Sequence, residues 1–198
     1  MRLFAAGASL FLVFIAAGNA IMCEYCLDLV NKRCYGELVN CPTNARGCLS
    51  AISEYNREGV GSAFTSFKNC SATKHKHIMY RSAVRHGFYQ LKVEVCQTSG
   101  CSKKPLHFPP KNNTLNGVKC PTCNATGALT CEADGFVECV GEMTNCIYMA
   151  ATFYRSVPPP TENSVYRGCT SAKSKNDYPE DNSHRLQNIE TLEISDGV

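Results

Sequence analysis

The cysteines are the residues whose type and spacing offer the most chemistry. There are 14 cysteines among 198 residues. Cys23 and Cys26, and again Cys120 and Cys123, have the Cys-x-x-Cys spacing that occurs in zinc sites and in thiol redox motifs. In a secreted chain the same spacing indicates disulfide bonds. Which chemistry applies therefore depends on the compartment that the chain enters.

Other reactive groups are few and scattered. His75 and His77 are two residues apart, so on a strand their imidazoles would share one face and could bind a metal ion. We favour the alternative, a solvated basic loop. A nucleophilic site needs a serine or cysteine with a base and an orienting acid, and no Gly-x-Ser-x-Gly motif occurs. We expect no catalytic residue, no metal site and no cofactor.

The N-terminal residues indicate the compartment. Arg2 precedes an almost wholly apolar run, 3–17, which ends in Gly18-Asn19-Ala20. This pattern is typical of a secretory signal peptide cleaved after Ala20. A retained signal anchor is the alternative, although the run is short for a membrane span. Because the C-terminus is polar, it lacks a lipid-anchor signal. We predict a secreted, extracellular protein with no membrane span or lipid anchor.

Composition and charge exclude two further classes. With 44% hydrophobic and 19% charged residues the chain is not intrinsically disordered, and a net charge of +3 argues against a nucleic-acid binder. Residues 21–106 hold twelve Lys/Arg against six Asp/Glu, whereas 115–170 hold three against five and 171–198 three against six. The cationic excess predicts a basic patch that binds an acidic receptor or membrane surface. The alternatives are a hydrated loop without a partner and a contact with the acidic tail. The patch comprises Lys74, His75, Lys76, His77, Arg81 and Arg85.

The cysteine spacing repeats along the chain. From Cys23 the gaps hold 2, 7, 6, 6 and 21 residues, and from Cys120 they hold 2, 7, 7, 6 and 22. Phe67-Lys-Asn-Cys70-Ser71 corresponds to Tyr166-Arg-Gly-Cys169-Thr170 at the end of the second copy. Such agreement indicates two copies of one module.

The repeat divides the chain into five parts. We expect a signal peptide at 1–20, a first module at 21–102, a proline-containing linker at 103–117, a second, incomplete module at 118–170 and a polar, flexible tail at 171–198. Each module is too small to bury a large core, so it depends on cross-links. Short strands are predicted, and no amphipathic helix. These strands are Arg33–Val39, Cys48–Tyr55, Gly61–Phe67, Gly87–Val95, Phe136–Val140 and Cys146–Tyr154.

The cysteine pattern that begins at Cys23 resembles the three-finger domain of the urokinase-receptor and snake-toxin superfamily. In that fold a disulfide-knotted base projects three β-loops. The resemblance covers nearly all of the mature chain and weakens after Thr170. It implies an all-β, small, disulfide-rich protein with two tandem three-finger modules, the second truncated. With Tyr-Arg-Gly-Cys in the second copy, the chain is similar to two secreted two-module families, the amphibian sodefrin precursor-like factors and the gamma-type phospholipase inhibitors.

The resemblance also implies how the cysteines pair. Two cysteines of the family pattern that bond to each other are both missing from the first module, and four later ones are missing from the second. All fourteen cysteines are then used in seven disulfides. The implied pairs are Cys23–Cys48, Cys26–Cys34, Cys41–Cys70, Cys96–Cys101, Cys120–Cys146, Cys123–Cys131 and Cys139–Cys169.

The function that the resemblance implies is non-enzymatic. The first family implies a pheromone-like signalling ligand recognised by a chemosensory receptor protein. The second implies an extracellular inhibitor whose partner is a secreted phospholipase. A secreted enzyme or redox protein is the alternative from another class, and a structural matrix or mucus component is a further one.

We expect a partner to contact the finger tips around Gly36–Val39, Asn56–Gly61 and Lys74–Arg85, and the turn at Val157–Pro160. Asn112 and Asn124 are candidate N-glycosylation acceptors. Asn69 also fits the acceptor pattern, but we expect its neighbour Cys70 to be bridged and crowded.

Overall fold

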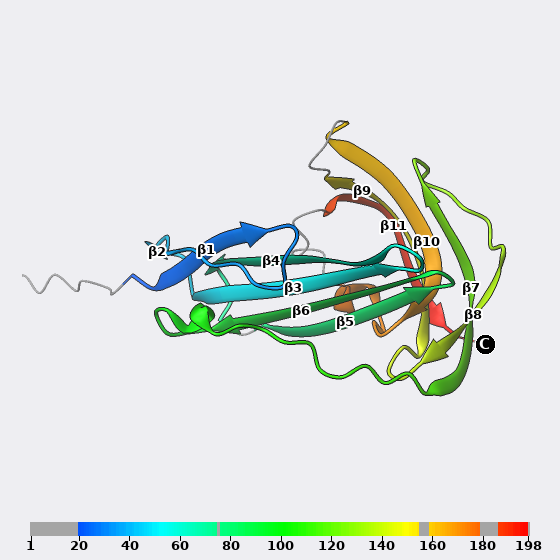
Figure 1. The fold of residues 1–198 in the computed structure, drawn as a ribbon, viewed down its shortest axis with the longest axis horizontal. Coiled ribbons are helices and arrows are strands. Elements are labelled where there is room, and N and C mark those ends of the chain that lie inside the picture. Colours follow the sequence, from blue (N-terminus) through cyan, green and yellow to red (C-terminus); the bar gives the residue numbers. More distant parts are fainter. Residues whose placement is uncertain (1–19, 75, 155–158, 179–185, 198) are drawn as a thin grey trace, which may run out of the picture.

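Figure 1 shows the computed structural model, which describes residues 20–74, 76–154, 159–178 and 186–197. In these ranges the chain forms β-strands and two 3-10 helices, and no α-helix. The predicted signal peptide lies outside them, apart from Ala20. The elements are β1 (Met22–Asp28), β2 (Glu37–Asn40), β3 (Gly47–Arg57), β4 (Gly61–Ser71), β5 (His77–Val84), β6 (Gly87–Cys96), η1 (Cys101–Lys103), β7 (Leu115–Thr126), β8 (Gly135–Val140), β9 (Asn145–Tyr154), β10 (Thr161–Thr170), η2 (Lys175–Asp177) and β11 (Leu186–Asp196).

The predicted strands correspond to β3, β4, β6, β8 and β9, with small differences at their ends. The predicted strand Arg33–Val39 is only partly right, because residues 33–36 form a loop before β2. A Cβ at Gly36 would lie 1.9 Å from the carbonyl oxygen of Tyr25, so only glycine lets this loop pass so close to β1. The sequence pattern does not predict β1, β5, β7, β10 or β11.

The two modules share one antiparallel sheet. β10 of the second module pairs with β5 of the first, where Cys169 lies opposite Ala83 and Thr170 opposite Ser82. The main path of the sheet runs β11-β9-β10-β5-β6-β3-β4-β1-β2, and the β7–β8 hairpin pairs with β10. Figure 1 shows the strands of the second module curving around one end of the flatter first module. The modules therefore do not swing freely about the linker.

The C-terminal segment, predicted to be a polar and flexible tail, contains a strand. Residues 186–196 form β11, which pairs with β9 along its length. Leu192 is buried, and Ile189 and Ile194 pack beside it against Ile147 and Met149. The apolar residues face the core, whereas Glu190 and Glu193 face solvent. The expectation of a flexible tail is wrong for this segment, and the second module continues beyond residue 170.

The linker is fastened along the first module. Lys92 Nζ donates to the carbonyl of His107 at 3.1 Å, and Lys111 Nζ lies 3.9 Å from the centroid of the Phe88 ring. These side-chain contacts hold the linker against β6. The linker therefore has a fixed path instead of acting as a free spacer.

Disulfides and a shared apolar cluster hold the fold together. Ala51, Phe67 and Leu91 of the first module pack with Ala172 from the chain that follows β10. Each disulfide contributes on the order of 2–4 kcal/mol by restricting the unfolded chain. All fourteen cysteines are bonded, in the same seven pairs that the resemblance implies: Cys23–Cys48, Cys26–Cys34, Cys41–Cys70, Cys96–Cys101, Cys120–Cys146, Cys123–Cys131 and Cys139–Cys169.

Candidate binding surfaces

Arg81, predicted to belong to the basic patch, lies buried where the two modules and the linker meet. Its Nε donates to Gln90 Oε1 at 3.2 Å, and its Nη1 donates to Glu142 Oε1 at 2.5 Å. Its Nη2 donates to the carbonyl of Pro109 at 2.9 Å. The guanidinium is therefore committed to internal contacts and is not available to a partner, contrary to the expectation from sequence.

Arg85 joins the tip of the β5–β6 hairpin to the second module. Its Nη2 donates to the carbonyl of Asp134 at 3.2 Å, and its Nη1 lies 3.7 Å from the Asp134 carboxylate. Its backbone N–H donates to Thr122 Oγ1 at 3.3 Å. The third finger of the first module thus docks on the second module, and its tip is not a free contact surface.

The rest of the predicted basic patch is dispersed. Lys74 is exposed, and Lys76 lies at the edge of the groove between the modules. His77 Nδ1 lies 3.7 Å from Glu94 Oε1 near the same edge. His75 lies outside the described residues, as do the first two residues of the predicted Val157–Pro160 turn. The predicted patch is therefore not one continuous cationic surface.

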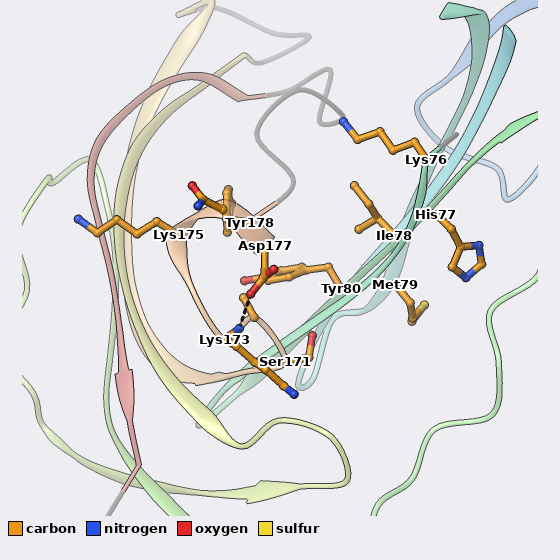
Figure 2. Close-up of a pocket in the computed structure, with 12 residues that line it drawn as sticks. Lys76, His77, Ile78, Met79, Tyr80, Ser171, Lys173, Lys175, Asp177 and Tyr178 are labelled. Carbon is orange, nitrogen blue, oxygen red and sulfur yellow. Dashed lines mark hydrogen bonds between the residues drawn. The ribbon is translucent and has the colours of Figure 1, made fainter. Parts of the chain in front are cut away.

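The groove between the modules has a volume of about 600 Å³ and is lined by β5 and the chain from Ser171 to Tyr178. Tyr80 contributes to its wall, and its ring meets that of Tyr178 edge-on with 5.3 Å between centroids. Burial raises the pKa of Tyr80, so its phenol is neutral at physiological pH. Figure 2 shows Lys76, Lys173 and Lys175 pointing in different directions around this space. The groove has the size of a ligand site but lacks the convergent polar groups of one.

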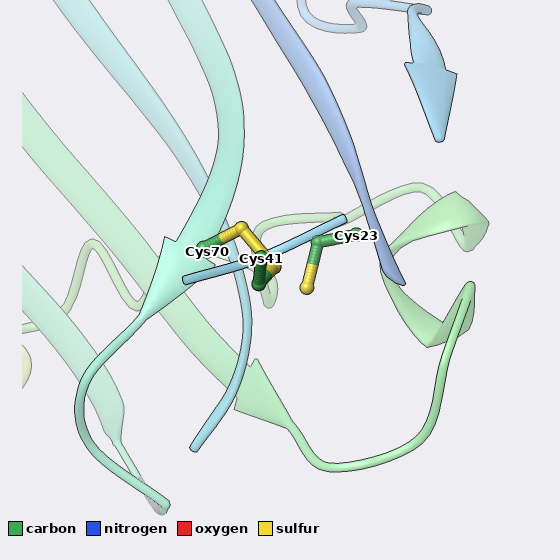
Figure 3. Close-up of side chains that lie close together, drawn as sticks. All are labelled: Cys23, Cys41 and Cys70. Atoms are coloured by element: carbon green, nitrogen blue, oxygen red, sulfur yellow. A yellow bond between two sulfur atoms is a disulfide. The ribbon is translucent and has the colours of Figure 1, made fainter. Parts of the chain in front are cut away.

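Two clusters of cysteine sulfurs resemble metal sites in their spacing. The Sγ atoms of Cys23, Cys41 and Cys70 all lie within 4.8 Å of one another (Figure 3), as do those of Cys120, Cys139 and Cys169. Zinc binds cysteine as thiolate, but each of these sulfurs is in a disulfide. The clusters are therefore the disulfide knots at the bases of the two modules.

The first finger, β1–β2 with its connecting loop, exposes apolar side chains. Of the ten large apolar side chains that are exposed in the described ranges, five lie between positions 25 and 38. Val30 and Tyr35 are each 74% exposed. Most of these residues lie outside the predicted finger tip Gly36–Val39, although apolar residues within a turn-rich loop are a signal of an exposed surface. The five are Tyr25, Leu27, Val30, Tyr35 and Leu38.

Two acidic residues of the first finger hold it in place through contacts within the first module. Asp28 Oδ1 accepts hydrogen bonds from the backbone N–H groups of Val30 and Asn31, both at 2.8 Å. Lys68 Nζ lies 2.7 Å from Glu24 Oε2, with both side chains buried. Together with the Cys26–Cys34 disulfide, these contacts fix the loop while its apolar side chains remain outside.

The other predicted finger tip, Asn56–Gly61, is exposed. Glu58 Oε2 lies 2.6 Å from His86 Nδ1, which links the tips of the second and third fingers. The candidate glycosylation sites Asn112 and Asn124 are both exposed, and they stay predictions. Asn69 is less accessible, and its Oδ1 accepts a hydrogen bond from the backbone N–H of Cys70. No helix in the described ranges is long and apolar enough to span a membrane.

Comparison with known proteins assigns the architecture to a family. The u-PAR/Ly-6 domain matches residues 19–104 and again 116–194, one range for each module. The chain belongs to the u-PAR/Ly-6 domain family. The second range includes nearly all of β11, which agrees with a module that extends beyond residue 170.

Similar proteins match this chain over both modules. The chain is 26% identical over 172 residues to a phospholipase A2 inhibitor NAI of Notechis ater, with 82% of this chain and 80% of the inhibitor covered. It is 26% identical over 189 residues to the gamma subunit of a phospholipase A2 inhibitor from Gloydius brevicaudus siniticus, with 91% of each chain covered. A crystal structure of mouse TEX101 matches with a TM-score of 0.42 and 17% identity, over 88% of this chain and 99% of that chain.

Proposed function

We propose that the protein is secreted and acts without catalysis, as a pheromone-like signalling ligand for a chemosensory receptor protein. The observation that carries this proposal is the fixed display of apolar side chains by the first finger, above all Val30 and Tyr35. Exposed apolar residues that cluster in this way mark interaction surfaces. The apolar run at 3–17 supports the secreted location.

Rigidity favours binding by this finger. A loop that a disulfide and internal hydrogen bonds already hold loses little conformational entropy when it meets a partner. Tyrosine is enriched among the residues that dominate binding energy in protein interfaces. The first finger therefore has a suitable composition and a suitable stiffness for recognition of a protein.

The test uses calcium imaging of chemosensory neurons exposed to the purified protein. Wild-type protein should evoke a response, and the double variant Val30→Ser/Tyr35→Ser should require at least about tenfold more protein for the same response. The control is Val60→Ser, because Val60 is 79% exposed on another finger. An absent response to the wild type, or an equal loss in the control, contradicts this role.

An inhibitor of a secreted phospholipase A2 is the second candidate. It is favoured by the two relatives named as phospholipase A2 inhibitors, which match most of this chain. The test titrates a secreted phospholipase A2 with the protein and follows hydrolysis of a phospholipid substrate. Loss of activity that saturates at a fixed stoichiometry favours the inhibitor, whereas unchanged hydrolysis with a neuronal response favours the signalling ligand.

A further inference from the structure

A small cationic groove lies between the first finger and the start of the linker. It is lined by Lys32, Arg33 and Tyr35 of the loop before β2, and by Lys103 and Leu106 at the start of the linker. Ile52 of β3 also lines it. We call these six residues the cationic groove. The basic patch predicted from sequence contains none of them.

Among the described residues, the cations of the cationic groove have no carboxylate in direct contact. At longer range Lys103 helps to lower the pKa of Glu24, and Lys32 helps to lower that of Glu54. Within the described ranges, Lys32, Arg33 and Lys103 form no ion pair. All three are exposed. In this respect they differ from Arg81 and Arg85, whose charges are used in contacts between the modules.

The nearby acidic groups already have partners. Glu24 is paired with Lys68, which also lines the groove. Burial opposes ionisation of Glu24, but hydrogen bonds from Lys68 and from the Gly36 backbone outweigh it and lower the pKa of that carboxyl. Burial likewise opposes ionisation of Glu54, but hydrogen bonds from Ser62 and Gln90 favour it. Together with the nearby charges of Lys111 and Lys32, these bonds lower the pKa of Glu54. Both carboxylates are thus bonded directly to other groups, and the groove keeps an excess of positive charge.

The loop that carries Lys32 and Arg33 is held in place before any ligand arrives. Ser66 Oγ donates to the carbonyl of Asn31 at 3.0 Å, which ties the loop to β4. Lys32 Nζ lies 4.3 Å from the centroid of the Phe64 ring. The Cys26–Cys34 disulfide closes the same loop. The cationic side chains therefore project from a fixed frame, which reduces the entropic cost of binding.

The size of the cationic groove decides what kind of ligand fits. Its volume is about 20 Å³, whereas sites that enclose small molecules hold roughly 300–1,000 Å³. It is therefore too small to enclose a small molecule, and a ligand would bind across its surface, as the side chains of a larger partner do. Tyr35, on its rim, adds an exposed aromatic ring, and tyrosine and arginine are both enriched in protein interfaces.

We propose that the cationic groove binds carboxylate side chains on an acidic segment of a protein partner. The charge distribution of the chain agrees, since residues 21–106 carry twelve basic against six acidic residues and 115–170 carry three against five. An acidic partner would be drawn to the first module and oriented there. This inference rests on the proposed function, because it names the chemistry of the partner.

The test measures binding of a fluorescein-labelled short polyglutamate peptide to the full-length mature protein by fluorescence anisotropy at low ionic strength. The variant Lys32→Glu/Arg33→Glu/Lys103→Glu should weaken binding by at least about tenfold. The matched control Arg46→Glu/Arg57→Glu/Lys74→Glu changes net charge equally at three other exposed residues of the first module. It should weaken binding by less than about threefold, through long-range charge alone.

Three outcomes would overturn the proposal. They are no binding by the wild type, an equal loss in both triple variants, and groove-dependent binding of heparin without binding of the peptide. The last outcome would assign the groove to sulfated polysaccharide. Because the peptide replaces any receptor or phospholipase, this result is independent of the neuronal and phospholipase assays. Circular dichroism of each variant verifies that it is folded.

Discussion

Arg81 of the first module and Glu142 of the second form an ion pair with 2.5 Å between Nη1 and Oε1. The side chain of Arg81 is 6% exposed and that of Glu142 is 45% exposed. Because the Arg81 guanidinium also donates to Gln90 and to linker carbonyls, one buried cation holds together three parts of the chain. Arg81 therefore helps to fix the relative placement of the modules, together with the pairing of β5 and β10.

Removal of the negative partner should therefore destabilise the protein. We expect Glu142→Gln to lower the free energy of unfolding by about 1–3 kcal/mol, because it leaves a charged group that is poorly solvated. Urea denaturation of the oxidised protein measures the change. The control is Glu138→Gln, which breaks the exposed pair with Lys119 and should cost less than about 1 kcal/mol. Equal effects of the two variants would contradict the role given to Arg81.

The buried pair of Glu24 and Lys68 predicts a pH dependence. The folded-state pKa of Glu24 lies below its usual 4.5, so the stability that its ionisation contributes is present above that value. This contribution is lost as the pH falls through the lower, folded-state pKa. Glu24→Gln should cost about 3 kcal/mol at pH 7, because it leaves the Lys68 ammonium buried without its counter-ion.

The measurement is the free energy of unfolding of wild type and Glu24→Gln from pH 7 down to strongly acidic pH. The gap between the two proteins should narrow as the pH falls below 4.5. A gap that stays constant across this range would show that ionisation of Glu24 does not stabilise the fold.

Packing of β11 gives a third prediction. Leu192 is buried against the second-module core, so Leu192→Ala should lower the free energy of unfolding by about 2–5 kcal/mol. Glu193→Ala is the control on the same strand, because this side chain faces solvent and should change stability by less than about 0.5 kcal/mol. Chemical denaturation compares the two variants. A negligible effect at Leu192 would mean that the segment is not part of the folded module.

The sequence predicts the covalent framework better than the surface. Cysteine spacing identifies two modules because a disulfide requires its residues at fixed places in the fold, as Cys41 and Cys139 illustrate. Arg81 forms an ion pair with Glu142, which lies 61 positions away in the sequence. A count of charges along the chain cannot detect this pair, so it assigns the buried Arg81 to an exposed basic patch. That Lys32 and Lys103 line one groove is not recognisable from the sequence, because the two residues lie far apart along the chain.

The tail departs from expectation for a different reason. Its mean polarity suggests an unstructured segment, but the apolar residues Ile189, Leu192 and Ile194 all pack on one side of β11. The register of β11 against β9 shifts on both sides of residues 188–189, and such irregularities interrupt a strict alternation of apolar and polar residues. A search for simple alternation therefore overlooks this strand.

The architecture requires that a disulfide fixes the first finger of each module. Peptide mapping under non-reducing conditions tests this requirement most directly. Proteolysis followed by mass spectrometry should recover Cys26 linked to Cys34 and Cys123 linked to Cys131, with no free thiol. Bonding of Cys26 or Cys123 to any other cysteine would contradict the architecture and, with it, the proposed binding surfaces.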